Sequence, residues 1–69
     1  MTQKELLYIE DAIGHENTII KVCEDTIEKL SDESLVEFLR NQVNDHQEIK
    51  KELINLLEVI ANEWSNING

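Results

Sequence analysis

The sequence lacks the residues that usually interrupt or cross-link a small protein. It has no proline, only two glycines and a single cysteine, Cys23. A lone cysteine excludes an internal disulfide, and so few helix breakers predict long, uninterrupted elements. A chain of 69 residues allows one domain. Because so short a chain buries little surface, we expect a metal or a second subunit to support it.

Basic residues are also scarce, with six Lys and Arg against fifteen Asp and Glu, which gives a net charge of -9. Such a chain repels phosphate backbones, so we expect no nucleic acid partner. It is not a basic membrane-surface helix, and no stretch approaches the roughly 20 apolar residues of a membrane span. No apolar run precedes the first acidic residues, so no secretory signal is expected. Together with one unpaired cysteine, these features predict a cytoplasmic protein without a membrane partner.

What the sequence does contain is helix-forming residues with clear start signals. Thr2 and Glu5 have the spacing of a capping box, in which the hydroxyl and the carboxylate each accept a free backbone N–H. The apolar pattern then pauses at residues 31–34. Ser31 or Asp32 is expected to cap a second helix that begins there.

We therefore predict an all-α protein with one helical-hairpin domain over residues 1–69. Helices at about 3–30 and 33–64 are joined by so short a turn that they must fold back antiparallel. An apolar row with steps of three and four residues predicts the core and dimer contacts. It consists of Leu6, Ile9, Ile13, Ile20, Cys23, Ile27 and Leu30, then Leu35, Leu39, Ile49, Leu53, Leu56 and Ile60. One hairpin leaves much of this row uncovered, so we expect a homodimer that forms a four-helix bundle.

Polar residues interrupt the row at one height. The rhythm of threes and fours falls on Glu16 in the first helix and on Gln42 and His46 in the second. When the chain is folded about Asp32, these interruptions come level, and a buried carboxylate needs partners there. A first interpretation is a polar layer that fixes the pairing register. A second is a metal site for Fe, Zn or Mn held by Glu16 and His46, and a third leaves Glu16 turned toward solvent.

Two neighbours of Glu16 have their own implications. Gly14 in mid-helix costs about 1 kcal/mol relative to Ala, which predicts a close helix approach near Glu16. His15 points about 100° away from Glu16 on a helix, so we expect it at the surface or in an interface. No nucleophile triad, phosphate loop or cysteine-based zinc motif is present, so we predict no enzymatic activity.

The chain resembles a known family over most of its length. The features are Glu10-Asp11 followed by His15-Glu16, the Asp32 turn with Leu35 after it, and His46 before a leucine-rich end. In these it is similar to the small ferritin-like proteins related to the spore-coat F group of Gram-positive spore formers. That resemblance implies a hairpin that is half of a ferritin-like bundle, associated with the spore.

The wider ferritin-like superfamily implies a di-iron centre built from one Glu and one Glu-x-x-His. Glu16 and His46 stand at the first and last of these positions, but Val43 stands where the bridging Glu is needed. The resemblance therefore implies a structural or interaction protein of the spore-coat kind, without a resident cofactor. Two alternatives remain: a metal-binding bundle protein that uses Glu16 and His46, and an acidic hairpin that regulates a partner protein.

Overall fold

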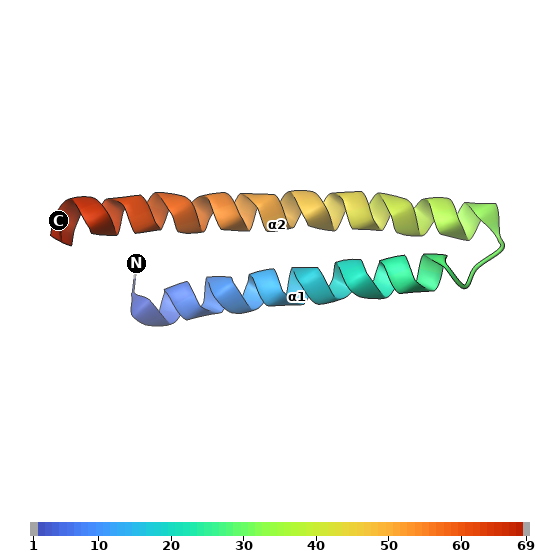
Figure 1. Cartoon of the computed structure of the whole chain (residues 1–69), viewed down its shortest axis with the longest axis horizontal. Helices are drawn as coiled ribbons and strands as arrows, with labels where there is room; N and C mark the ends of the chain where they lie inside the picture. The colour runs from blue at the N-terminus through green and yellow to red at the C-terminus, as the bar shows by residue number, and fades with distance from the viewer. Residues whose placement is uncertain (1, 69) are drawn as a thin grey trace.

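The computed structural model describes residues 2–68, and the side chains of residues 2–64. It contains two helices, α1 (Gln3–Ile27) and α2 (Glu33–Asn68), which pack antiparallel along their length (Figure 1). The Cα atoms span 54 × 16 × 13 Å, so the chain is a flat rod two helices wide. The predicted all-α two-helix hairpin is confirmed.

Both helices begin at side-chain caps. The Thr2 hydroxyl accepts the backbone N–H of Glu5 at 3.1 Å, and the Glu5 carboxylate accepts the backbone N–H of Thr2 at 3.0 Å. This confirms the predicted capping box. At the second start, Asp32 Oδ1 accepts the backbone N–H of Leu35 at 3.1 Å, so Asp32 rather than Ser31 caps α2.

The turn between the helices is longer than the sequence indicated. α1 ends at Ile27, three residues before the predicted end, and α2 runs to Asn68, four residues beyond it. The N–H of Lys29 donates to the Thr26 carbonyl, and the N–H of Leu30 donates to the Ile27 carbonyl. These bonds span three residues instead of the four of an α-helix, so the α-helix ends before them. Leu30 continues the apolar row, but it reaches its half-buried place from the turn.

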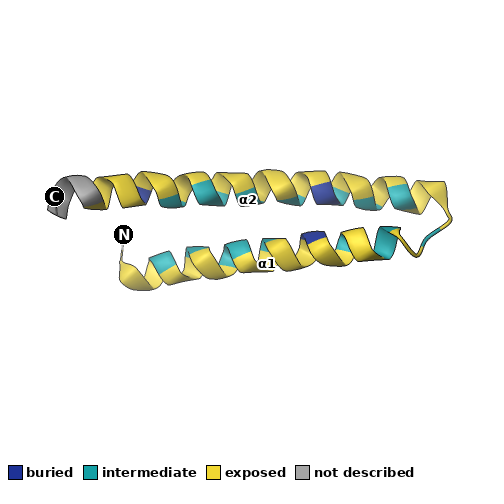
Figure 2. Cartoon of the chain, in the orientation of Figure 1, coloured by how far each residue is buried: buried dark blue, intermediate teal, exposed yellow. Residues whose placement is uncertain are grey.

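Each helix turns one row of side chains toward the other, and we call these two rows the contact rows. In α1 the row is the predicted one, with every member buried or half-buried. In α2 it is Val36, Leu39, Val43, His46, Lys50, Leu53, Leu57 and Ile60. Figure 2 shows the buried and half-buried stretches of both helices facing each other. Among the described side chains only Ile20, Val43 and Ile60 fall below a tenth exposed, so this core is thin.

Three members of the predicted α2 row do not face α1. Leu35, Ile49 and Leu56 are 51%, 41% and 44% exposed in the hairpin. Their neighbours one residue later, among them Val36 and Leu57, turn inward instead. The reason is that α2 carries two adjacent apolar rows about 100° apart, and a rhythm of threes and fours can be followed on either.

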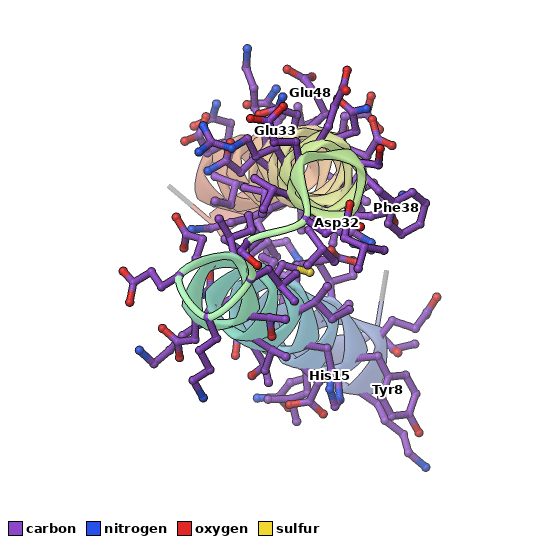
Figure 3. The ribbon with its side chains drawn as sticks, turned by 90° about the vertical axis from the view of Figure 1, so that its right-hand side faces the viewer. Tyr8, His15, Asp32, Glu33, Phe38 and Glu48 are labelled. Atoms are coloured by element: carbon purple, nitrogen blue, oxygen red, sulfur yellow. The ribbon has the colours of Figure 1, made fainter. Side chains whose placement is uncertain are left out.

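The second row belongs to an exposed apolar surface that we call the open face. It comprises Tyr8, Ala12, His15, Ile19 and Val22 of α1, and Leu35, Phe38, Gln42, Asp45, Ile49, Glu52, Leu56 and Val59 of α2. Tyr8 and Phe38, both 59% exposed, project to the same side of the hairpin (Figure 3). Glu33 and Glu48 lie instead on the outer side of α2, away from α1. The hairpin therefore has one apolar side and an acidic back.

Candidate functional site

The polar contact between the helices joins Glu16 of α1 to His46 of α2. The Nδ1 atom of His46 lies 2.5 Å from Oε2 of Glu16, and the side chains are 15% exposed for Glu16 and 22% for His46. The structure thus brings together two of the three residues assigned to the polar layer. Glu16 is held in the interface and does not turn out to solvent.

Local geometry places both side chains in the gap between the helices. Glu16 stands four residues before the buried Ile20, and His46 three residues after the buried Val43, so each shares the face of a core residue. A carboxylate that is largely removed from water requires a hydrogen-bond donor, and the imidazole provides it. The contact therefore satisfies a polar group that would otherwise weaken the thin core.

Gln42 lies apart from this pair. Its side chain is half-buried on the open-face row of α2, and among the described side chains it shares no hydrogen bond with Glu16 or His46. One turn beyond His46, Lys50 is half-buried on the contact row. The sequence pattern does not predict Lys50 on the contact row, because the row of threes and fours was continued from His46 to Ile49. The strict continuation of Val43 and His46 to residue 50 is the signal that finds it. A lysine at such a place lays its apolar stem along the core and keeps its ammonium in water.

The Glu16–His46 pair has two metal-binding side chains, and within one hairpin it gains no third. Among the described residues, no three His, Cys, Asp or Glu side chains gather closely enough to hold an ion. Further ligands must therefore come from a second copy if the pair is to bind a metal, since zinc sites use three or four protein ligands.

Gly14 does not mark a close helix approach inside the hairpin. A Cβ atom built on Gly14 meets nothing within 4 Å, and the residue is exposed. The expected approach near Glu16 is wrong, because Gly14 lies on the side of α1 that faces neither α2 nor the open face. Its carbonyl accepts the Thr18 hydroxyl at 3.1 Å.

An apolar hollow of about 340 Å³ lies at the open end of the hairpin. It is lined by Thr2, Gln3, Leu6, Leu57, Ile60, Ala61 and Trp64. It lies where the start of α1 meets the last turns of α2, which extend past α1 (Figure 1). None of the described side chains that line the hollow is charged, so it offers packing space rather than a reactive site.

Comparison of the chain with protein-family models, with curated proteins and with solved structures gives no match. No helix in the described part of the chain combines the length and apolar character needed to cross a membrane. Two features of the hairpin are candidates for its function, the Glu16–His46 pair and the open face.

Proposed function

We propose that this chain is a non-enzymatic structural protein that works by helical association. Two hairpins bury their open faces against each other and complete a four-helix bundle. The observation that carries this proposal is the accessible surface of 5470 Å². A compact folded monomer of 8.0 kDa exposes about 4450 Å² by the usual scaling of surface with mass. The hairpin exposes roughly 1000 Å² more than that, and a stable interface covers about 800 Å² on each partner.

The dimensions of the open face support a second copy as its occupant. The Cα atoms of the whole hairpin extend 54 by 16 Å, a projected area of roughly 860 Å², which is of the order of one side of a standard interface. Its apolar residues lie on both helices, so an occupant that covers them must span the width of the hairpin. A second hairpin has the same length and width, and it offers the same apolar side.

The test is sedimentation equilibrium of the wild-type chain and of two variants. Wild type should have twice the chain mass at micromolar concentration. Phe38→Glu, which places a charge in the open face, should shift the protein to monomer. Leu7→Glu is the matched control, because Leu7 is 55% exposed but lies off the open face on α1. A wild-type chain that is a compact, cooperatively folded monomer overturns the proposal and favours an acidic hairpin whose open face binds another protein.

The family resemblance gives this association a setting. Small ferritin-like proteins of the spore-coat kind imply an architectural role in sporulating cells, and a homotypic helical bundle suits that role. Loss of the open face should then impair assembly rather than a reaction. We therefore expect Phe38→Glu to impair assembly in cells as well as in solution, with Leu7→Glu again as the control.

A second candidate function is metal binding by a bundle, supported by the 2.5 Å contact between Glu16 and His46. Association brings two such pairs into one bundle, and imidazole with carboxylate suits Zn, Fe or Mn. The test is thermal unfolding with and without each metal, for wild type and for His46→Ala. A rise in melting temperature that His46→Ala abolishes supports the site. Equal shifts in both proteins indicate binding by the surface acids, and no shift in either removes this candidate.

A further inference from the structure

The residues of α1 are poorly suited to holding a helix without packing. β-branched side chains lose rotational freedom in a helix, which lowers their preference for it. In α1 they are Ile9, Ile13, Thr18, Ile19, Ile20, Val22, Thr26 and Ile27. Gly14 adds a cost in backbone entropy in the middle of the helix, and the capping box stabilises only the first turn. The helix therefore depends on tertiary contacts more than on the intrinsic preference of its residues.

Polar interactions along α1 do not offset this weakness. Its last turn contains Glu24 and Asp25 and no basic residue, so both carboxylates lie near the negative end of the helix dipole. The ion pair between Lys21 and Asp25 is 3.7 Å long, and its side chains are 78% and 56% exposed, so it contributes little. The Thr26 hydroxyl donates to the Val22 carbonyl at 2.7 Å, a local bond that slightly destabilises a helix.

One hairpin does not provide the packing that α1 needs. Among the described side chains of α1 only Ile20 is buried. An unfolded chain of 8.0 kDa exposes about 11,600 Å², so the hairpin, at 5470 Å², removes only about 53% of that surface from water. A domain of this size that folds alone removes about 60% and is already marginal. A second copy that covers about 800 Å² of each hairpin raises the fraction to about 60%.

We infer that α1 is helical only while a second copy covers the open face, so this chain folds as it associates. This inference rests on the proposed function and specifies how the association is regulated. The stability of a dimer whose subunits do not fold alone depends on the concentration of the chain. Below the dissociation constant, no folded hairpin then presents Tyr8, Ile19 and Val22 together with the apolar row of α2. An exposed apolar surface that could bind wrong partners therefore does not accumulate.

The first measurement follows helix content and mass of the wild type on dilution, by circular dichroism and by sedimentation equilibrium. Helix content should fall by about two-fifths or more, because α1 has 25 helical residues and α2 has 36. The midpoint of this loss should coincide with the midpoint of the loss of dimer mass. Phe38→Glu, which disrupts the open face, should show the reduced helix content at every concentration, whereas Leu7→Glu should follow wild type.

Gly14→Ala tests the link between folding and association away from the interface. Gly14 is exposed, its φ is not positive, and a Cβ built on it meets nothing within 4 Å, so alanine fits there. Alanine favours the helix over glycine by about five-fold. If each copy must fold α1 in order to associate, both copies contribute, and the dissociation constant should fall about 25-fold. Lys21→Arg is the matched control. It lies two turns later on the same side of α1 and keeps both charge and helix preference, so it should leave the constant unchanged.

The possible outcomes separate this inference from the proposed function. A dimer that dissociates without losing helix content, or a dissociation constant that Gly14→Ala leaves unchanged, overturns the inference and leaves the proposed association intact. A wild-type chain that is monomeric at every concentration overturns both. Where the dimer is too tight to dissociate by dilution, wild type and variants are compared at one fixed urea concentration.

Discussion

Among single residues, Glu16 and His46 carry the largest local conflict between burial and polarity. Each side chain is mostly removed from water, at 15% and 22% exposure, and each depends on the other for its hydrogen bond. Replacing a satisfied buried pair by apolar groups is often neutral or stabilising, whereas removing one partner leaves the other unsatisfied. The pair is therefore better explained as a device for alignment than as a source of stability.

This explanation predicts strong non-additivity at the two positions. Glu16→Leu and His46→Leu should each lower the free energy of unfolding by about 1–2 kcal/mol, because the remaining partner is largely buried. The double variant should recover most of that loss, since a leucine pair fills the contact rows. Urea unfolding followed by circular dichroism measures the free energy of unfolding of wild type, both single variants and the double variant, which together form a double-mutant cycle. Additive losses would mean that the contact contributes no coupling and that each residue acts alone.

Glu5 offers a prediction about pH. Its hydrogen bonds from the backbone and the hydroxyl of Thr2 hold the pKa of the carboxyl below its usual 4.5. A depressed folded pKa stabilises the protein above the unfolded value and loses that effect as pH falls through the folded pKa. Glu5→Gln keeps a capping-box residue but cannot ionise. The difference in melting temperature between wild type and Glu5→Gln should be largest above pH 5 and close toward pH 3. A difference that is constant with pH contradicts this assignment.

At the scale of the helices, much of the hairpin is predictable from local signals. The capping box, the pause at residues 31–34 and the single apolar row of α1 all have a direct physical cause within a few residues. The height of the Glu16–His46 contact follows from the short turn and the equal rise of both helices. The orientation of α2 does not follow in the same way. Its apolar stripe is two rows wide, and only packing against α1 selects the inner row.

The width of this stripe also explains why Ile49, predicted as a core or dimer contact, does not face α1. Ile49 and Lys50 are adjacent, and hydrophobicity favours Ile49 as the inward residue. The structure turns Lys50 toward α1 and leaves Ile49 41% exposed, because the row through Val43 and His46 continues to residue 50. The packing of the whole contact row against α1 therefore outweighs the hydrophobicity of the single residue Ile49. Ile49 is then available to the open face.

The start of α2 gives a prediction at this scale. Asp32 accepts the backbone N–H of Leu35, and Ser31 makes no such bond among the described residues. Asp32→Ala should therefore lower the free energy of unfolding by about 1 kcal/mol. Ser31→Ala, one residue earlier in the same exposed turn, is the control and should change it little. The measurement is thermal or urea unfolding at a fixed protein concentration, because association adds to the apparent stability. Equal effects of the two substitutions would place the cap elsewhere.

For the whole molecule, the acidic surface opposes the association that the open face favours. Each copy carries a net charge of -9, so two copies repel at long range. Much of this charge lies away from the open face, as Glu33 and Glu48 on the outer side of α2 show (Figure 3). Asp45 and Glu52 are different, since both interrupt the open-face row.

Salt should therefore strengthen association rather than weaken it. Raising NaCl from about 20 mM to 500 mM shortens the screening length from roughly 20 Å to about 4 Å and removes most of the repulsion between copies. The dimer dissociation constant from sedimentation equilibrium should fall several-fold over this range. Asp45→Asn combined with Glu52→Gln should tighten the dimer at low salt and reduce its salt dependence. Glu33→Gln combined with Glu48→Gln removes the same charge from the back of α2, so it should have a smaller effect. If salt instead dissociates the dimer, ion pairs rather than apolar packing hold the copies together, and the open face is not their interface.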